Sequence, residues 1–504
     1  MKNRKQSAAE IKNGETIPLS AVPVLRYGEF AEMNSSLASG EGFHCSHMFA
    51  AEHEKGQRIF CIMADDTNGT LLVSSAVPGR GEVLKSLTAM HPSFHPFERA
   101  MAETPGIKYA DHPWPKPLRY PESPTGEKHR MEDYPFFQIK GEDLHEVGVG
   151  PIHAGVIEPG HFRFICNGEK VLHLEIQLGY QHRGAEELLV SKKGMMEKVM
   201  LAESAAGDTT AGNASAFALV YESLAGAKPD SHVSYCRTLA LELERMAIHT
   251  GDLAALSGDV AYQLGNAVFG RLRTPIINYT QSWSGNRLGR GQIRPGRVNF
   301  PFTEKLALSL EKMLAEYSRD YIEMADTLFH MPGVQARFHK TGRLTKDDAL
   351  SMGLVGMPAR STGIRRDIRA THPHDHYTLV RHEPVLLPWG DVQARAQLRD
   401  LEIRQSMEMV SGMIKNIPPQ GRQADLDGKK LKSSSLCVSL VEGWRGEICH
   451  AAITDRKGEI SCYRIKDPSM HNWFGLAMAL RGQEISDFPL CNKSFNLSYC
   501  GHDL

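Results

Sequence analysis

The residues best suited to chemistry are His182, Arg183 and Glu186, which lie close together in the sequence. They follow a predicted β-hairpin, in which an Asn-Gly turn separates the alternating runs 160–166 and 171–178. A carboxylate beside a guanidinium can relay protons when burial shifts its pKa. The alternative is a structural ion pair. The residues alone leave both interpretations open.

Other patterns give weaker signals. The tract His372-Pro-His-Asp-His376 has the composition of a metal site, but its spacing favours a solvated loop over a zinc site. The nine cysteines are dispersed and form no Cys-x-x-Cys pair, which indicates reduced, mostly packed thiols. The glycines at 289–296 lack the Gly-Lys-Ser/Thr ending of a phosphate loop. None of these patterns predicts a nucleotide or metal site.

The bulk composition narrows the class of protein. A chain of 504 residues has room for several domains, and 58 basic against 59 acidic residues gives a net charge of −1. This balance provides no overall attraction to nucleic acid, so we expect no nucleic-acid partner. The basic N-terminus precedes no signal-like apolar core, and no run approaches the ~20 apolar residues of a membrane span. We therefore expect a cytoplasmic chain.

The chain is expected to begin with a small α+β unit. Short β-rich runs at 58–63 and 70–74 precede a predicted helix at 81–90. The following passage, 112–121, is rich in prolines that fix an extended path. We therefore assign residues 1–111 to an N-terminal domain and 112–145 to a Pro-rich linker.

Helical periodicity dominates the middle of the chain. In 302–324 apolar residues recur at steps of three and four, with Thr303 placed as the cap, and a similar stripe runs through 234–256. From about 433 the pattern predicts strands at 436–441, 446–454 and 459–465, and a helix at 472–481. The fold class is therefore α+β: a small N-terminal α/β domain and a larger domain, 146–504, with a central helical bundle and flanking small sheets.

Several segments, in order, resemble the large subunits of energy-converting NiFe hydrogenases, including formate-hydrogenlyase-type subunits, and the quinone-site subunit of complex I. They are Gly150-Pro-Ile-His-Ala-Gly-Val-Ile-Glu-Pro-Gly-His-Phe-Arg163, Leu178-Gly-Tyr-Gln-His-Arg-Gly-Ala-Glu186, Asn286-Arg-Leu-Gly-Arg290, Gly356-Met-Pro-Ala-Arg-Ser-Thr-Gly-Ile-Arg-Arg-Asp-Ile-Arg369 and Val441-Glu-Gly-Trp-Arg-Gly-Glu447. The passage from Phe97 to Arg119 resembles the small accessory subunit of complex I. The resemblance implies that 1–111 is an accessory-subunit-like fusion and 146–504 a large-subunit-like domain.

The chain departs from this family at its metal ligands. The family motifs read roughly Arg-x-Cys-Gly-x-Cys-x-x-x-His and Asp-Pro-Cys-x-x-Cys, and their four thiolates hold nickel and iron. The four cysteine positions are occupied by Ala206, Thr209, Ser498 and Gly501. Cys500 is displaced by one residue from its nearest ligand position. Because such a metal needs soft thiolate ligands, we expect no metal ligand in this chain and no hydrogenase activity.

The resemblance also implies positions for the remaining candidate residues. His182, Arg183 and Glu186 would face the active cavity as a proton relay. The resemblance places the following residues around the same cavity: His153, His161, Asp208, Asn213, Arg360 and Asp367. Asp208 and Asn213 could instead cap a helix that starts near Thr210. The buried charges of Arg360, Asp367 and Arg369 could instead be kept for the fold.

The implied function is that of a large subunit in a membrane-associated, complex I-like oxidoreductase complex. It would receive electrons from a 4Fe-4S cluster in a small iron–sulfur subunit, next to ferredoxin-like and antiporter-like membrane subunits. We expect no cofactor bound by this chain, with a quinone as the one candidate ligand of its cavity. The chain would lie on the inner face of the cell membrane through its partners. It ends four residues after Cys500, without the long extension that nickel-loaded relatives often cleave, so we expect no nickel assembly.

Three alternatives remain. The first is a quinone-reducing, NADH dehydrogenase-like subunit, although complex I subunits usually open with a His-Pro-x-x-His-Gly-like string and this chain has His153-Ala-Gly-Val-Ile-Glu-Pro-Gly-His161. The second is a catalytically silent scaffold that couples redox change to ion translocation. The third is hydrogenase activity through an unusual metal site. Loss of all four ligands favours the scaffold, whereas retention of Glu186 and its neighbours favours chemistry.

Overall fold

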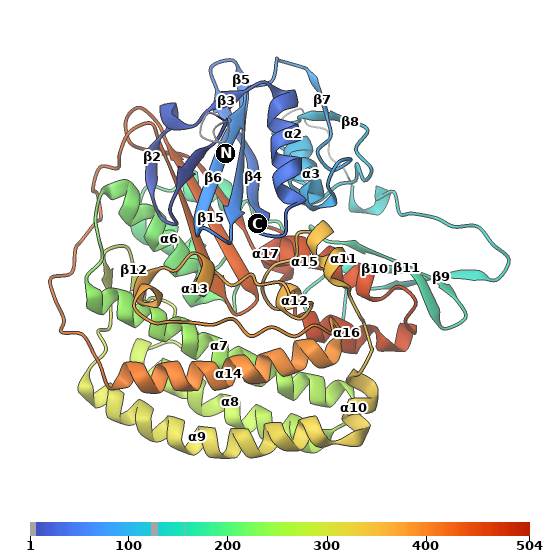
Figure 1. Ribbon diagram of the computed structural model, residues 1–504, viewed down its shortest axis with the longest axis vertical. Helices are drawn as coiled ribbons and strands as arrows, with labels where there is room; N and C mark the ends of the chain where they lie inside the picture. The colour runs from blue at the N-terminus through green and yellow to red at the C-terminus, as the bar shows by residue number, and fades with distance from the viewer. Residues whose placement is uncertain (1–6, 122–129, 156) are drawn as a thin grey trace.

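The computed structural model describes residues 7–121, 130–155 and 157–504. The predicted α+β class is confirmed, because small sheets lie at one end of the molecule and long helices at the other (Figure 1). None of the helices within the described ranges is long and apolar enough to cross a membrane.

The N-terminal unit is built on a five-stranded sheet. Its path is β1-β6-β5-β4, and β3 pairs with β6 in parallel. The strands are β1 (Ala9–Ile11), β3 (Val24–Leu25), β4 (Phe43–His53), β5 (Gly56–Asp65) and β6 (Thr70–Ala76). Helices α2 (Tyr27–Ala38) and α3 (His95–Glu103) pack on one face of the sheet, where Phe30 and Phe97 enter its core.

The helix predicted at 81–90 is wrong. This segment contains the short strand β7 (Val83–Lys85), which pairs in parallel with β8 (Lys108–Ala110). Gly81 just before it has a φ of +76°, which starts an extended path rather than a helix. A short apolar run cannot distinguish a strand from a helix by periodicity alone.

The second sheet joins the two ends of the chain. Its order is β16-β15-β14-β2, so the N-terminal strand β2 (Thr16–Pro18) extends a sheet whose other strands come from the C-terminal region. Those strands, β14 (Ser435–Gly443), β15 (Gly446–Thr454) and β16 (Ile460–Lys466), confirm the predicted ones. The same continuous core contains residues of both sheets, among them Phe60, Ile62, Val438 and Leu440.

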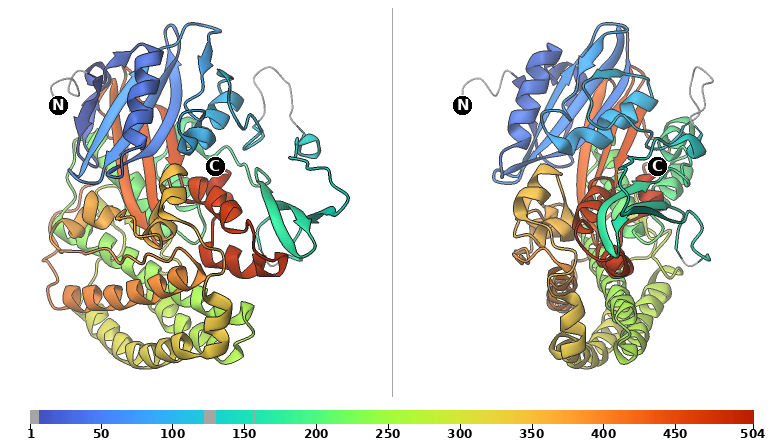
Figure 2. Two further views of the ribbon diagram at one scale, coloured as in Figure 1. Left: turned by 45° about the vertical axis from the view of Figure 1, so that its right-hand side comes forward. Right: turned by 90° about the vertical axis from the view of Figure 1, so that its right-hand side faces the viewer.

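Four long helices form the opposite end of the molecule (Figures 1 and 2). They are α7 (Ser231–Asp259), α8 (Gln263–Ser284), α9 (Glu304–His330) and α14 (Val392–Ile414). The stripes predicted in 234–256 and 302–324 are confirmed as α7 and α9, and the Thr303 side chain accepts from the Leu306 amide at 3.4 Å. Their apolar faces bury one large core.

Shorter elements connect these layers. The predicted hairpin is confirmed as β10 (His161–Asn167) and β11 (Lys170–Gln177), and β9 (Leu144–Val149) makes it a sheet that stands out from the body (Figure 2). The other helices are α4 (Ala185–Ser191), α5 (Met195–Glu203), α6 (Thr210–Ala225), α10 (Pro332–Phe338), α11 (Lys346–Ser351), α12 (Gly356–Arg360), α13 (Ile368–Thr371), α15 (Ser469–Ala479), α16 (Phe488–Phe495) and α17 (Tyr499–His502). A two-stranded ladder pairs β12 (Ile293–Arg294) with β13 (Arg297–Val298).

The shared core of the two sheets can be tested with Ile62→Ala. Ile62 is fully buried, so truncation should lower the free energy of unfolding by about 2–5 kcal/mol. Leu308→Ala on α9, where the side chain is 69% exposed, should change it by less than about 0.5 kcal/mol. Chemical denaturation measures both. Equal effects would contradict a core that joins the sheets at Ile62.

Candidate functional site

The two segments that lack metal ligands lie side by side. Ala206 and Thr209 belong to the loop before α6, and Ser498 and Gly501 lie at the start of α17. Arg183 holds the two segments together: its guanidinium donates to the carbonyl oxygens of Ser204 (2.8 Å) and Ala205 (3.1 Å), and to that of Cys500 (3.1 Å). The arrangement of these segments around one site, expected from the sequence, is therefore present, although Arg183 contributes to it through backbone contacts.

The opening segment approaches the same place. The Glu158 carboxylate accepts from the Tyr499 amide at 3.3 Å. Gly160 lies so close to the Tyr499 ring that a Cβ on it would come within 2.7 Å of a ring carbon. His153 and His161 brace this segment, because their ring nitrogens lie 2.8 Å from the Gly160 oxygen and 3.0 Å from the Gly150 oxygen, respectively. Three distant parts of the chain thus meet at one site.

An arginine joins the loop before α6 to the C-terminal segment. Arg445 lies in the turn between β14 and β15 and is only 4% exposed. Its Nη1 and Nη2 donate to the two carboxylate oxygens of Asp208 at 2.6 and 2.7 Å, and its Nε donates to the Asn496 backbone oxygen at 2.6 Å. Nη1 also lies 3.1 Å from the Thr209 hydroxyl. A fixed cation therefore connects the two segments that hold a metal in the resembling family.

The local charges make this pair stable. Burial alone would raise the pKa of Asp208, but Arg445 and its hydrogen bonds hold that pKa below the ordinary value. The Arg445 guanidinium also lies over the neighbouring Trp444 ring, 3.9 Å from its centroid, and the Trp444 indole donates to the Asp208 backbone oxygen at 3.0 Å. Such bidentate pairs combine charge with fixed geometry.

The donor groups at this site do not fit a nickel–iron centre. Ala206 offers no donor, and the Ser498 hydroxyl already accepts from the Gly501 amide at 2.9 Å as the cap of α17. A Cβ on Gly501 would come within 2.7 Å of the Asp467 carboxyl, so that position is closed to a larger side chain. The Cys500 thiol lies 3.5 Å from the Ser498 hydroxyl, and burial raises its pKa. Hard oxygen donors and a nearby guanidinium oppose binding of a soft-ligand metal.

Asp208 and Asn213 have partners other than those considered from the sequence. Helix α6 does start at Thr210, but its N-cap residue Thr209 makes no side-chain cap bond, and the Ala211 and Gly212 amides donate to Glu244 of α7 instead. Asp208 pairs with Arg445, whereas the Asn213 amide donates to the Thr209 oxygen at 3.0 Å and its oxygen lies 3.2 Å from His450 Nε2. The capping interpretation is therefore wrong, because stronger partners occupy both side chains.

Glu186 and His182 line one cavity of about 50 Å³ between the two units, together with His47, Arg119 and Arg464. The Glu186 carboxylate accepts from the Ile465 amide at 2.8 Å. It also lies 3.4 Å from Arg119 and 3.6 Å from Arg464. Glu186 and His182 therefore line one cavity, in which Glu186 is paired with two arginines.

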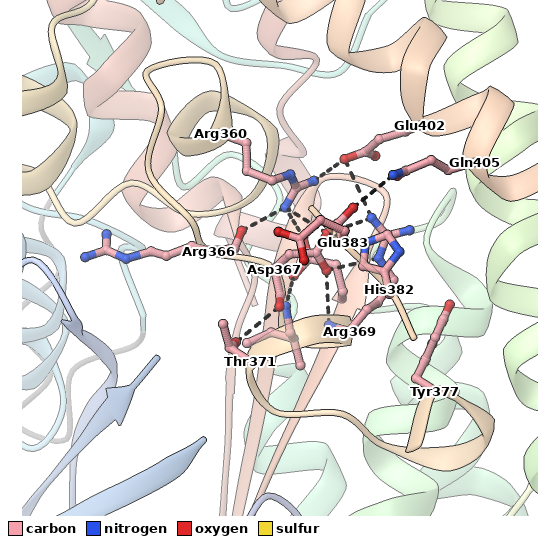
Figure 3. A network of polar contacts seen from close by, with 12 residues as sticks. Arg360, Arg366, Asp367, Arg369, Thr371, Tyr377, His382, Glu383, Glu402 and Gln405 are labelled. Carbon is pink, nitrogen blue, oxygen red and sulfur yellow. Dashed lines mark hydrogen bonds and ion pairs between the residues drawn. The ribbon is translucent and has the colours of Figure 1, made fainter. Parts of the chain in front are cut away.

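Arg360 and Asp367 belong to a buried charge network (Figure 3). Arg360 contacts Glu402 at 2.5 Å and Glu442 at 2.7 Å, and Asp367 contacts Arg369 at 2.7 Å. Burial alone would raise the pKa of Asp367, but Arg369 and Arg360 hold it well below the ordinary value. The side chains therefore pair with one another, as the interpretation of charges kept for the fold predicts.

The network also positions Arg445. Arg245, which lies 3.4 Å from Glu402, donates to the backbone oxygens of Glu442 at 2.9 Å and Gly443 at 3.3 Å. These carbonyls begin the turn that carries Arg445. Burial and the Asp367 charge raise the pKa of Glu442 itself to about 7. A group with this pKa changes charge near neutral pH, directly behind the site.

The histidine tract is not a solvated loop, so that prediction is wrong. His372 and His374 are buried, and His372 Nε2 lies 3.1 Å from the Thr70 oxygen. Asp375 pairs with Arg237 at 3.5 Å, which holds the tract against α7. The part of the chain that the structure describes contains no group of three or more His, Cys, Asp or Glu side chains that could hold a metal ion.

Sequence reasoning missed Arg445 and Arg119. Arg445 is part of the Val441–Glu447 motif, and an acidic residue in the altered ligand loop, Asp208, was the signal that could have suggested a basic partner. Arg119 stands in the Pro-rich linker, where no pattern pointed to the site.

Comparisons with known proteins show which chains this sequence is similar to. Residues 264–435 match the family model of the respiratory-chain NADH dehydrogenase, 49 Kd subunit. The chain is 26% identical over 369 residues to formate hydrogenlyase subunit 5 of Escherichia coli K12, covering 73% of this chain and 64% of that protein. It is 26% identical to the alpha subunit of the membrane-bound hydrogenase of Pyrococcus furiosus, covering 70% and 85%. It is also 26% identical to an NADH-quinone oxidoreductase subunit from Dehalococcoides mccartyi BAV1, covering 68% and 93%.

The resemblance predicted from the sequence is thereby confirmed: this chain is similar both to large subunits of hydrogenase-related complexes and to a complex I subunit. The match spans less than two thirds of formate hydrogenlyase subunit 5 and of hydrogenase-4 component G, at 64% and 63% of their lengths.

The Asp208–Arg445 pair can be tested with Asp208→Asn. Arg445 would keep its buried charge but lose an ionic partner, which should cost about 1–3 kcal/mol of unfolding free energy at neutral pH. The matched control, Asp320→Asn, breaks the surface pair with Arg271 and should leave the denaturation midpoint close to that of the wild type. Denaturation midpoints of both variants measure the difference. An Asp208 variant as stable as the control would refute the role of the pair.

Proposed function

We propose that this chain is the large subunit of a membrane-associated, multi-subunit oxidoreductase related to hydrogenases and complex I. In this role it takes electrons from an iron–sulfur cluster of a partner subunit and carries no nickel–iron centre. The observation that carries the proposal is the Arg445 guanidinium, which binds Asp208 in one of the segments where thiolate ligands would be needed and the Asn496 carbonyl in the other. The names of the relatives, which include hydrogenase and NADH-quinone oxidoreductase subunits, support the class of complex.

The proposed partners follow from the same class. They are a small iron–sulfur subunit with a 4Fe-4S cluster, a ferredoxin-like subunit and antiporter-like membrane subunits, through which the chain would sit peripherally on the membrane. Protons would be supplied through Glu186 and His182, which share a cavity. A quinone is the candidate acceptor of these electrons.

A silent scaffold that couples redox change to ion translocation is the second candidate. It is favoured by the pairing of Glu186 with Arg119 and Arg464, because a carboxylate that contacts two guanidinium groups and one backbone amide is fixed in position. A side chain fixed in this way is suited to a structural role. The two candidates differ in what they predict for Glu186.

The absence of a nickel–iron centre can be tested by metal analysis of the purified complex. We expect nickel far below one equivalent per chain, because the site offers a methyl group, two hydroxyls and a glycine in place of thiolates. Iron should match the partner's cluster alone. The same preparation of a nickel-binding relative serves as the positive control. Stoichiometric nickel would refute this part of the proposal.

The role of Glu186 can be tested with Glu186→Gln in the assembled complex. If it relays protons, electron transfer should fall on the order of 10²-fold, because general acid–base groups contribute about 10²–10⁴-fold. The control is Glu316→Gln, an exposed glutamate on α9 that lies outside this cavity. Unchanged electron transfer and ion translocation in Glu186→Gln would instead favour the scaffold.

A further inference from the structure

A second cavity lies beside Ala211 in the first turn of α6, between α7, α8 and the segment 284–293. It measures about 30 Å³, which is room for roughly one water molecule. Its walls are largely apolar and include Leu243, Ala247, Ile277, Trp283 and Ile293. Of the described residues that line this cavity, Glu244 is the one with a carboxyl group.

Most other polar groups of this cavity are already bonded to the backbone. Ser284 donates to the Thr280 oxygen at 2.8 Å, and Thr280 donates to the Ile276 oxygen at 3.1 Å. The Gln292 amide donates to the Phe300 oxygen at 2.7 Å. Arg287 is exposed. Glu244 is therefore the acidic group left to interact with whatever enters the cavity.

Glu244 is tied to the functional site through α6. Its carboxyl accepts from the Ala211 amide at 2.8 Å and from the Gly212 amide at 3.4 Å. These amides belong to the first turn of α6, directly after the loop whose Asp208 binds Arg445. Within the described ranges, Glu244 forms no ion pair with a Lys, Arg or His side chain, in contrast to Glu186.

Burial, more than the neighbouring charges, favours the protonated form of Glu244. Burial raises its pKa to about 8, and the Asp208 carboxylate adds to this effect, whereas the Ala211 and Gly212 amides and Arg245 oppose it. Arg445 neutralises Asp208 from the β14–β15 turn, and Arg287 lines the cavity from the segment after α8. A carboxyl of this kind can hold a proton and release it without leaving its position.

We propose that Glu244 is a proton-holding residue of the remodelled site and that it exchanges its proton with solvent through this cavity. In the uptake step the carboxylate gains one proton from a water molecule in the cavity, which leaves as hydroxide; in the release step the carboxyl O–H bond breaks and hydroxide takes the proton to form water again. Release places a second negative charge near Asp208 and thus strengthens the field on Arg445. Its use in proton-coupled electron transfer rests on the proposed function, but the proton binding does not.

The proton binding can be tested by infrared titration of the full chain between pH 6 and pH 10. We expect the wild type to lose the carbonyl band of one protonated carboxyl with a midpoint near pH 8, and Glu244→Gln to lack that change. Glu442→Gln removes the other carboxyl whose pKa is near neutral and so shows which part of the band change comes from Glu442. Glu186→Gln should show the same band change as the wild type. A wild-type change retained in Glu244→Gln would overturn the proposal.

The pH dependence of stability gives a second readout. Because the pKa of Glu244 is higher in the folded chain than its ordinary value of 4.5, its stabilising contribution is fully present below about pH 4.5 and is lost progressively as pH rises from there to about 8. The denaturation midpoint of the wild type should therefore fall more between pH 6 and pH 9 than that of Glu244→Gln. Parallel falls in the two proteins would overturn the proposal.

The route and the use of the proton need separate measurements. Ala247→Leu should fill the cavity and slow the band change after a pH jump, and an unchanged rate would overturn the route. In the assembled complex, Glu244→Gln should slow electron transfer, and an unchanged rate would overturn its use there. If the wild-type complex transfers no electrons, the proposed function is wrong. The infrared titration of Glu244 tests the proton binding independently of that result.

Discussion

A buried guanidinium must be surrounded by acceptors, and this requirement organises the site. Arg445 is almost completely enclosed, so its charge is acceptable only because Asp208, Thr209 and the Asn496 carbonyl meet it from two separate segments. Arg183, whose side chain is exposed, also donates to backbone oxygens of both segments. Cation-to-oxygen bonds thus join parts of the chain that metal–sulfur bonds join in the resembling family.

The turn that carries Arg445 is itself fixed from behind. Arg245 binds the carbonyls that begin this turn, and the side-chain carboxylates of Glu402 and Glu442 bind Arg360. These groups come from α7, α14, α12 and β14, so the helical bundle and the C-terminal sheet both determine where the guanidinium lies. A change in charge within the network would therefore be felt at the site, and Glu442, with a pKa of about 7, is the member whose charge changes near neutral pH.

Sequence periodicity predicted the long helices well, because the apolar stripes of α7 and α9 face one core and repeat over many turns. It failed at 81–90, where a run of a few apolar residues carried too little pattern to separate a strand from a helix. The family motifs predicted that the opening segment and the two altered ligand segments lie around one site. They could not indicate the Arg445–Asp208 pair or the burial of His372, because both depend on partners distant in sequence: Arg445 lies 237 residues from Asp208, and Thr70 lies 302 residues from His372.

The pairing of β2 with β14 makes the N-terminal unit part of the larger domain. A strand of three residues near the start of the chain covers the edge of a sheet formed more than 400 residues later, and the two sheets share a core. During synthesis the N-terminal sheet would therefore present an apolar face until residues 435–466 emerge. Expression of the large-subunit-like part alone would leave β14 as an open edge strand, which is a surface prone to pair with other chains. The two units thus depend on each other for solubility, which gives a physical reason for them to remain fused in one polypeptide.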